Sequence, residues 1–207
     1  AGRPLAVGNI SIIEAWIFFI VLALISFALL WFTNTLTIKL SIFFGFLIVL
    51  YPITKRFISA PQFILGITFG SGSLIAYSLE TSVFSASILT LYIGIVAWII
   101  SFDTYYALQD KNDDLEIGVN STAILWAENA IIYSKVLHLA FYASLLTIAI
   151  INSFSYFFFF IFIGLFYLFL HQNKLLKNSD YLGAFKINNW IGIISVSGFA
   201  LEIIFLN

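Results

Sequence analysis

Apolar residues recur in long runs along the whole of this chain, separated by polar segments. A helix that spans a membrane needs about 20 consecutive, mostly apolar residues, and the runs approach that length. The pattern therefore predicts seven membrane-spanning helices, at roughly 14–32, 36–53, 62–79, 83–102, 135–152, 154–171 and 189–206.

Composition agrees with this interpretation, because 62% of the residues are hydrophobic and only 9% are charged. A water-soluble domain could not carry so much apolar surface. We expect an all-α protein, a polytopic transmembrane helix bundle that forms a single domain over residues 1–207. A formal net charge of −1 argues against a nucleic-acid partner. The absence of cysteine excludes disulfides and thiolate metal sites.

The connections between the predicted helices alternate between two kinds. The short and nearly uncharged ones are 33–35, 80–82 and 152–155. The longer ones, which hold most of the charge, are 54–61, 103–134 and 172–188. Only Lys39 lies on the side of the short connections, whereas eight cationic residues lie on the other: Arg3, Lys55, Arg56, Lys111, Lys135, Lys174, Lys177 and Lys186. Because cytoplasmic loops are enriched in lysine and arginine, we expect the long connections to face the cytoplasm.

Acidic residues concentrate between Ser101 and Ala123, a stretch with five of the ten acidic residues in the chain. If a helix continues through it, spacings of three, four and seven place four aspartates and a tyrosine in one stripe: Asp103, Tyr106, Asp110, Asp113 and Asp114. Carboxylates this close repel one another unless cations bind between them, and oxygen ligands suit Mg²⁺ or Ca²⁺ better than zinc. The stripe therefore predicts a hard-cation site.

A second polar cluster, from Tyr51 to Arg56, is predicted on the same side of the membrane. Pro52 stops a predicted helix at the interface, and two adjacent cations follow it. Lys55 can act as a point charge for phosphate, while the guanidinium of Arg56 can bind a phosphate or a carboxylate with two hydrogen bonds. Cations and metal-binding carboxylates at one membrane face would suit a pyrophosphorylated substrate whose apolar remainder lies among the helices.

The aspartate-rich stretch resembles the second aspartate-rich motif of the UbiA superfamily of membrane prenyltransferases, in particular the 4-hydroxybenzoate polyprenyltransferases. That motif runs Asp-Thr-x-Tyr-Ala-x-x-Asp-x-x-Asp-Asp and is followed by Gly-x-Lys-Ser-Thr-Ala. The chain matches it at Asp103-Thr104, Tyr106-Ala107, Asp110, Asp113-Asp114, Gly118 and Ser121-Thr122-Ala123. Asn120 departs from the pattern, since the family usually has lysine there, and this puts in doubt the diphosphate or loop contact that the lysine makes.

The resemblance extends over most of the chain. Further matches are Arg3-Pro4-Leu5 with Gly8, Tyr51-Pro52 with Lys55-Arg56, Pro61-Gln62 with Leu65-Gly66 and Phe69-Gly70, and Phe185-Lys186 with Asn188-Asn189 and Gly192. The family has nine transmembrane helices and a first aspartate-rich motif in the loop after the second helix. The resemblance therefore implies two helices and that motif upstream of residue 1, and we expect the 207 residues alone to be inactive.

The resemblance also implies an activity, the Mg²⁺-dependent transfer of a polyprenyl group from an allylic diphosphate to the ring of 4-hydroxybenzoate in ubiquinone biosynthesis. Mg²⁺ and cations would neutralise the leaving pyrophosphate, and the allyl cation would attack the electron-rich ring. Asp110 and Asp114 are the first candidates for Mg²⁺ ligands, and Asp103 and Asp113 are the second.

Roles in catalysis and substrate binding follow from the same resemblance. Lys55 would hold the diphosphate, and Arg56 either the diphosphate or the aromatic carboxylate. Tyr106 and Tyr51 could orient groups or stabilise the cation with their rings. The remaining expected substrate-binding residues are Arg3 and Ser121.

Each pattern also has a purely structural interpretation. The aspartates could belong to a solvated loop, and Lys55 and Arg56 could act as topology signals alone. His138 and His171 have no partner at metal-ligand spacing, so we expect satisfied packing roles for both. The phenylalanines at 157–160 indicate a lipid-facing or packing surface.

Rival functions are weaker. CDP-alcohol phosphotransferases also cluster aspartates in a membrane, but their motif begins Asp-Gly, and nothing here fits that order. A transporter or non-catalytic scaffold would place charges in mid-span and show an internal repeat, and the chain has neither. A UbiA-type enzyme with another aromatic acceptor is the remaining alternative.

We expect the protein to lie in a bacterial inner membrane, or alternatively in a mitochondrial one, and infer no obligate protein partner.

Overall fold

The computed structural model of the protein describes residues 4–5 and 7–206, and within them the secondary structure is helical, without strands. Seven long helices account for most of the chain: α1 (Ile12–Leu30), α2 (Thr35–Thr54), α3 (Pro61–Ser78), α4 (Ala86–Gln109), α7 (Ala130–Ile151), α8 (Ile161–Lys177) and α10 (Asn188–Leu201). Shorter elements join them: α5 (Lys111–Glu116), α6 (Thr122–Leu125), η1 (Ala127–Asn129), η2 (Phe158–Phe160), α9 (Tyr181–Lys186) and η3 (Glu202–Leu206).

Local sequence explains where several of these helices begin. Ser11 and Glu14 form a reciprocal capping box at the start of α1. The side chains of Asn34 and Ser85 accept hydrogen bonds from the first turns of α2 and α4. Pro61 occupies the first turn of α3, where its missing N–H costs nothing. Predicted helix starts therefore agree with the structure to within a few residues at these four positions.

Among the described residues, six helical segments are long and apolar enough to cross a membrane: Ile12–Leu30, Thr35–Thr54, Ala86–Gln109, Ala127–Ile151, Phe158–Lys177 and Tyr181–Ile204. The helix predicted at 62–79 does form, as α3, but it is not among the six. It carries several polar residues, and Gln62, Thr68 and Ser71 are buried against its neighbours. The all-α membrane bundle is confirmed, whereas the count of seven spans is not.

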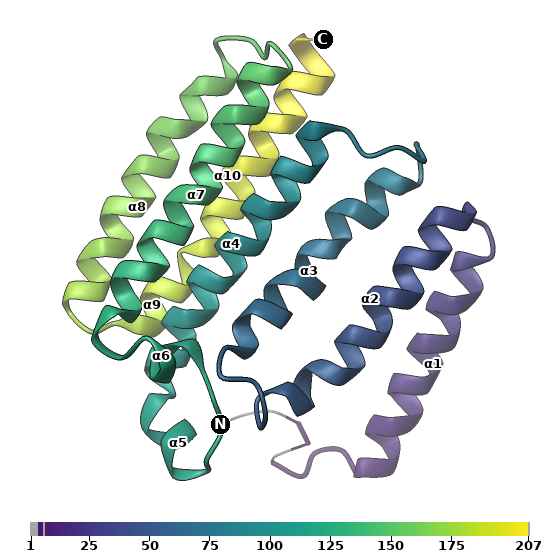
Figure 1. The fold of residues 1–207 in the computed structure, drawn as a ribbon, viewed down its shortest axis with the longest axis vertical. Coiled ribbons are helices and arrows are strands. Elements are labelled where there is room, and N and C mark those ends of the chain that lie inside the picture. Colours follow the sequence, from purple (N-terminus) through teal and green to yellow (C-terminus); the bar gives the residue numbers. More distant parts are fainter. Residues whose placement is uncertain (1–3, 6, 207) are drawn as a thin grey trace.

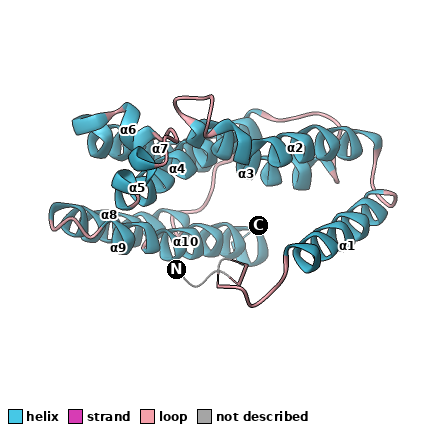
Figure 2. Cartoon of the chain, turned by 90° about the horizontal axis from the view of Figure 1, so that it is seen from below, coloured by secondary structure: helices cyan, strands magenta, loops and turns pink. Residues whose placement is uncertain are grey.

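Consecutive long helices run antiparallel, and the bundle has two layers. Figure 1 shows α4 in the centre, between α3 and α7. In the view from below, α2, α3, α4 and α7 form one layer, α8, α9 and α10 lie in the other, and α1 stands apart (Figure 2). The main core lies where α4, α7, α8 and α10 meet, around Phe141, Leu145, Leu165 and Ile191. By contrast, α1 buries none of its side chains.

The connections that carry most of the charge lie together. The α2–α3 connection, the segment with α5 and α6, and the α8–α9 connection are all at the lower end of the bundle in Figure 1. The connections at the opposite end are short. The fold therefore brings the aspartate-rich stretch and the end of α2 to one rim, as the alternation of the loops predicts.

The aspartate-rich stretch is not one continuous helix. α4 extends to Gln109, well beyond the predicted end at residue 102, and so carries Asp103 within its last two turns. At Asp110 the backbone leaves helical geometry, with φ −94° and ψ 4°, and α5 starts afresh at Lys111. Because the chain changes direction there, the predicted single stripe is divided between two helices.

Candidate active site

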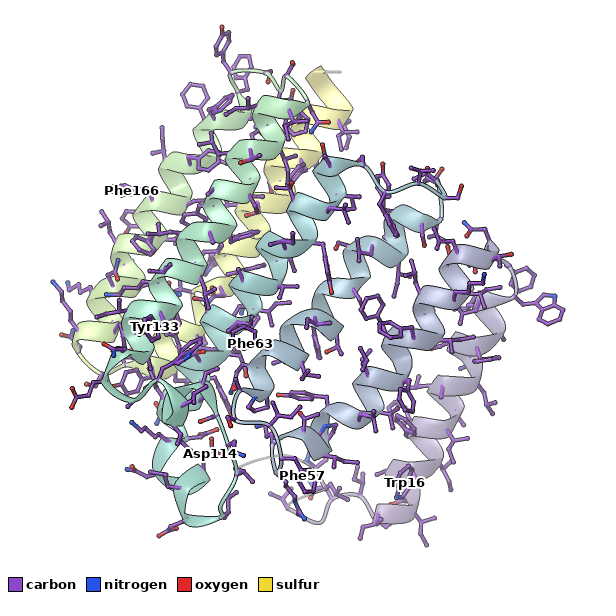
Figure 3. All side chains as sticks on the ribbon, in the orientation of Figure 1. Trp16, Phe57, Phe63, Asp114, Tyr133 and Phe166 are labelled. Carbon is purple, nitrogen blue, oxygen red and sulfur yellow. The ribbon has the colours of Figure 1, made fainter. Side chains whose placement is uncertain are left out.

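Three of the four predicted metal ligands lie within electrostatic reach of one another at the rim. Asp103 on α4, Asp110 at the junction and Asp114 on α5 are each partly buried, and the charges of Asp110 and Asp114 both act on Asp103. Asp113 is exposed, because it lies on the other side of the short helix α5. Figure 3 shows Asp114 at the same end of the bundle as Phe57, which lies in the α2–α3 connection. Asp103, Asp110 and Asp114 are therefore partly buried and within electrostatic reach of one another, whereas Asp113 is exposed to solvent.

The end of α2 supplies a cation to this group. Lys55 is partly buried, and its charge acts on both Asp103 and Asp114. Tyr51, one helical turn earlier, lies within electrostatic reach of the same two carboxylates. Arg56 is exposed. Of the two adjacent cations predicted from the sequence, Lys55 is therefore the one that faces the aspartates.

The pKa of Asp114 reflects the burial of its carboxyl group and the charges around it. Partial burial raises the pKa of its carboxyl group above the ordinary value, and the neighbouring charges of Asp110 and Asp113 act in the same direction. Lys55 and the side chain of Ser121 oppose the change. Burial is the largest of these effects, so the carboxyl group of Asp114 is harder to ionise than usual, and a bound cation would stabilise its ionised form.

A loop between α5 and α6 holds the site together through three hydrogen bonds. The main-chain N–H of Asn120 donates to the carbonyl oxygen of Lys55 at 2.8 Å. The main-chain N–H of Thr122 donates to Oε1 of Gln62 at 2.9 Å. The hydroxyl of Thr122 also forms a hydrogen bond with the hydroxyl of Thr104, at 2.7 Å. The loop therefore connects the end of α2, the start of α3 and the last turns of α4.

The other predicted site residues have varied surroundings. Ser121 is buried, caps α6 by accepting a hydrogen bond from the N–H of Ile124, and lies beside Asp114. Tyr106 is partly buried, and its ring contacts that of Phe185 on α9 with centroids 5.2 Å apart. Arg3 lies outside the described residues.

Aromatic side chains lead from the rim into the bundle along one face of α4. Trp98 and Phe102 are one turn apart, and Phe102 and Tyr106 both contact Phe185. Nε1–H of Trp98 donates a hydrogen bond to Oδ1 of Asn188 at 2.7 Å. A cavity of about 510 Å³ adjoins this pair, lined by Trp98, Asn188, Asn189, Gly192, Ile193, Val196 and Ser197.

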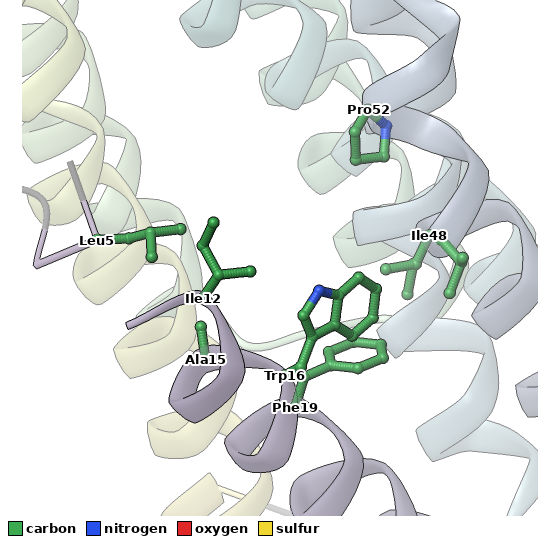
Figure 4. Close-up of a pocket in the computed structure, with 8 residues that line it drawn as sticks. Leu5, Ile12, Ala15, Trp16, Phe19, Ile48 and Pro52 are labelled. Atoms are coloured by element: carbon green, nitrogen blue, oxygen red, sulfur yellow. The ribbon is translucent and has the colours of Figure 1, made fainter. Parts of the chain in front are cut away.

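A second cavity, of about 470 Å³, is almost entirely apolar and lies between α1 and α2 (Figure 4). Its lining residues are Leu5, Ile12, Ala15, Trp16, Phe19, Ile48, Val49 and Pro52. None of the predicted site residues that the structure describes lines it. Pro52 is nevertheless only three positions before Lys55, so the cavity opens within one helical turn of the cationic end of α2.

Within the described part of the chain, no three histidine or acidic side chains gather closely enough to hold a metal ion by themselves. His171 is exposed. The satisfied packing role predicted for both histidines is therefore wrong for His171. His138 is buried against the rings of Tyr142 and Phe169 as expected, but neither of its ring nitrogens has a hydrogen-bond partner among the described residues. At 157–160, Phe158 is buried and Phe160 is exposed, so that run is both core and lipid-facing surface.

Comparison with known proteins identifies this arrangement. The model of the UbiA prenyltransferase family matches residues 1–192. The chain belongs to the UbiA prenyltransferase family. It is therefore a prenyltransferase of a multi-pass membrane class, which agrees with its six candidate spans.

Several relatives are similar to this UbiA chain over nearly all of its length. A 4-hydroxybenzoate octaprenyltransferase of Tolumonas auensis is 34% identical over 97% of the chain and 71% of the relative. A protein of the same name from Saccharophagus degradans is 35% identical over 100% of the chain and 70% of the relative. One from Pseudomonas aeruginosa is 45% identical over 61% of the chain and 43% of the relative.

The fold of this UbiA chain also has a counterpart among solved structures. The apo structure of a UbiA homolog from Aeropyrum pernix superposes with a TM-score of 0.83 over 98% of the chain and 77% of that protein. Because the two sequences are 24% identical, this likeness shows the fold alone.

Sequence reasoning missed two residues that position the UbiA site. Gln62 and Asn188 were noted as family matches, but neither was predicted to contact the site elements. Both are buried polar residues within apolar helices, at 1% and 6% exposure. That signal, an amide in an apolar helix, marks them as residues that need hydrogen-bond partners.

Proposed function

We propose that this protein transfers a polyprenyl group from an allylic polyprenyl diphosphate to the ring of 4-hydroxybenzoate, as a step of ubiquinone biosynthesis. The names of the relatives support this acceptor and this class of donor. The second candidate, transfer to a different aromatic acceptor, uses the same site residues and differs only in what binds beside them.

One observation carries the proposal. Asp103, Asp110, Asp114 and Lys55 lie within electrostatic reach of one another at a single rim of an apolar helix bundle. Carboxylates and an ammonium group at the same place suit a substrate that is strongly anionic at one end. The apolar cavity of about 470 Å³ next to Pro52 offers room for the hydrocarbon at the other end.

The donor set fits Mg²⁺. Oxygen ligands suit this ion, which is usually held by one or two carboxylates together with substrate phosphates and waters rather than by a complete cage of protein ligands. Asp110 and Asp114 are the proposed ligands, with Asp103 behind them and Asp113 less favoured because of its exposure. Bound Mg²⁺ would supply charge neutralisation for the diphosphate leaving group.

The chain's own residues bind and orient the substrates. Lys55 would pair with the diphosphate, held in place through its carbonyl oxygen by Asn120. Arg56 would reach a phosphate or carboxylate from the exposed side of α2. Tyr51 would direct its hydroxyl toward the carboxylates, and the ring of Tyr106, braced by Phe185, would stabilise developing positive charge. The C–O bond to the diphosphate breaks, a C–C bond forms to the ring, and the ring proton leaves.

Ser121 and Arg3 complete the proposed substrate-binding residues. Ser121 lies beside Asp114, which would let its hydroxyl contact a phosphate oxygen. The excess of lysine and arginine at this rim supports a cytoplasmic orientation in a bacterial inner membrane.

A direct assay tests the proposal. Membranes that contain the natural protein are incubated with Mg²⁺, a polyprenyl diphosphate and 4-hydroxybenzoate, and 3-polyprenyl-4-hydroxybenzoate is measured. We expect product that requires Mg²⁺ and that is lost with Asp114→Asn but kept with Asp113→Asn. Product only with another aromatic acceptor would favour the second candidate, and no prenyl transfer to any aromatic acceptor would contradict both.

A further inference from the structure

A group of buried polar side chains lies between α4, α7 and α8, on the side of α4 that faces α7. Their side-chain polar atoms are shielded from solvent and have no hydrogen-bond partner among the described residues. The atoms are Ser101 Oγ, Tyr105 OH, Ser134 Oγ, His138 Nδ1 and Nε2, and Gln172 Oε1. We call these five residues the buried polar cluster.

Two contacts fix the antiparallel register of α4 and α7 and show that four of these residues are neighbours. Gly94 lies directly against Ser144, and the ring of Trp98 stacks on that of Phe141 with centroids 4.7 Å apart. Each turn along α4 therefore corresponds to one turn back along α7. One turn further, Ser101 comes level with His138, and the next turn brings Tyr105 level with Ser134.

The fifth residue reaches the same place from α8. The ring of His138 is 5.7 Å from that of Phe169, and Gln172 follows Phe169 by one turn. Tyr105 packs against Leu176, one turn beyond Gln172. Nε2 of Gln172 donates to the carbonyl oxygen of Ala184 at 2.8 Å, which leaves its Oε1 as a free acceptor. Gln172 therefore lies between the levels of His138 and Tyr105.

The two serines of the cluster differ from similar residues elsewhere in the bundle. Thr104, Ser144 and Ser195 each donate their hydroxyl to a carbonyl oxygen one turn earlier, at 2.6, 2.7 and 2.8 Å. Ser101 and Ser134 do not. A buried polar group without a partner costs about 1–3 kcal/mol, and in an apolar membrane interior bulk water is not at hand to satisfy it.

We propose that the buried polar cluster is an internal water site, in which ordered water bridges α4, α7 and α8. The cluster offers hydroxyl and imidazole donors together with imidazole, hydroxyl and amide acceptors, and a buried water typically makes about three hydrogen bonds to such groups. It contains no carboxylate, lysine or arginine, so its chemistry suits a neutral molecule rather than an ion. Tyr105 and Ser101 lie close enough to bond to each other, but that bond satisfies only those two and leaves Ser134, His138 and Gln172 without partners.

The position of this water site gives it a role. Ser101 and Tyr105 lie on the same turns of α4 as Asp103 and Thr104, but on the face toward α7. Water bridges there would hold the back of α4 to α7 and α8 and so steady the helix that carries Asp103. This inference does not depend on the identity of the substrates.

Radiolytic footprinting tests the proposal, because hydroxyl radicals formed from bound water modify the side chains that contact it. The natural protein is irradiated in lipid nanodiscs, and modification is read by mass spectrometry. Tyr105 and His138 are both 0% exposed, and Phe158 is a control ring at 2% exposure that packs against the rings of Phe154, Phe162 and Phe199. We expect modification of Tyr105 and His138 several-fold faster than that of Phe158.

A paired variant sharpens the test with little change in volume. Ser101→Ala with Ser134→Ala removes two partners of the water, and we expect modification of Tyr105 and His138 to fall toward the rate of Phe158. Rates for Tyr105 and His138 no higher than that of Phe158 in the natural protein would overturn the proposal. Unchanged rates in the paired variant would overturn it as well, since the serines would then not hold the water.

Discussion

The backbone amide of Asn120 donates a hydrogen bond to the carbonyl oxygen of Lys55 over 2.8 Å. The contact uses main-chain atoms only, so it does not depend on which side chain stands at position 120. The departure of Asn120 from the family lysine therefore leaves this anchor of the loop intact.

This anchor leads to a prediction with two substitutions at one position. Asn120→Ala should keep the stability of the protein, because the N–H remains. Asn120→Pro removes the donor and should cost about 1–3 kcal/mol by leaving the carbonyl of Lys55 unpaired. Thermal unfolding in detergent measures both. Equal stability of the two variants would show that the contact is unimportant.

Asp113 and Asp114 are adjacent in sequence but differ in exposure, which makes them a matched pair. Asp114→Asn should lower kcat/KM by about 10²–10³-fold, comparable to the loss of one charge-stabilising group. Asp113→Asn should change it little. Prenyl transfer at saturating Mg²⁺ is the measurement, and similar losses for both variants would mean that α5 turns differently in the active protein.

Lys55 and Arg56 form a second matched pair. Lys55→Met should reduce prenyl transfer strongly, by roughly 10²-fold, because its charge faces Asp103 and Asp114. Arg56→Met should have the smaller effect, mainly on KM for the substrate that the guanidinium contacts. A larger loss for Arg56→Met would contradict the assignment of Lys55 as the diphosphate ligand.

The raised pKa of Asp114 predicts how stability changes with pH when no divalent cation is present. Folding holds the proton of Asp114 more tightly than the unfolded chain does. The contribution that this proton makes to the free energy of unfolding is therefore fully present below the ordinary aspartate pKa of about 3.9. It is lost as pH rises through the higher pKa of Asp114 in the folded state. Asp114→Asn should flatten this part of the curve and raise Tm at neutral pH.

Mg²⁺ supplies the control for that prediction. The ion should raise Tm of the natural protein at neutral pH and should raise that of Asp114→Asn less, because a ligand stabilises the folded state more when it binds that state more tightly. Differential scanning fluorimetry with EDTA or Mg²⁺ gives both values. A Tm for Asp114→Asn below that of the natural protein in EDTA would contradict the raised pKa of Asp114.

Gly94 provides a packing prediction. A Cβ at this position would lie 2.6 Å from Cβ of Ser144, so Gly94→Ala should force α4 and α7 apart and lower stability by about 1–3 kcal/mol. Gly72 has open space around it, and Gly72→Ala should be neutral or slightly stabilising through helix propensity. Ser144→Gly should partly rescue Gly94→Ala. Equal effects at the two glycines would contradict the close approach.

The sequence alone predicts much of this fold because apolar runs and capping residues act locally. Helix starts near Ser11, Asn34, Pro61 and Ser85 follow from signals within one turn. The end of α4 was misplaced because hydropathy falls at Asp103 although the helix continues to Gln109. Helical geometry does not require apolar residues, so hydropathy marks the membrane boundary rather than the helix end.

Parts of the site could not be predicted, because they depend on contacts between distant residues. The hydrogen bond from Thr122 to Gln62 joins residues 60 positions apart. Spacing placed Asp103, Asp110, Asp113 and Asp114 on one face, but the break at Asp110 turns Asp113 outward. A single non-helical residue is enough to redirect all side chains after it, and sequence periodicity does not reveal such a residue.

Every long, charged connection lies at one end of the bundle, so the two membrane faces of the enzyme differ in charge. The proposed aromatic acid, a water-soluble molecule, would enter only from the compartment that the charged rim faces. The hydrocarbon half of the donor and of the product can stay in the lipid throughout. Each turnover would then convert a freely diffusing metabolite into a membrane-confined one without moving charge across the bilayer.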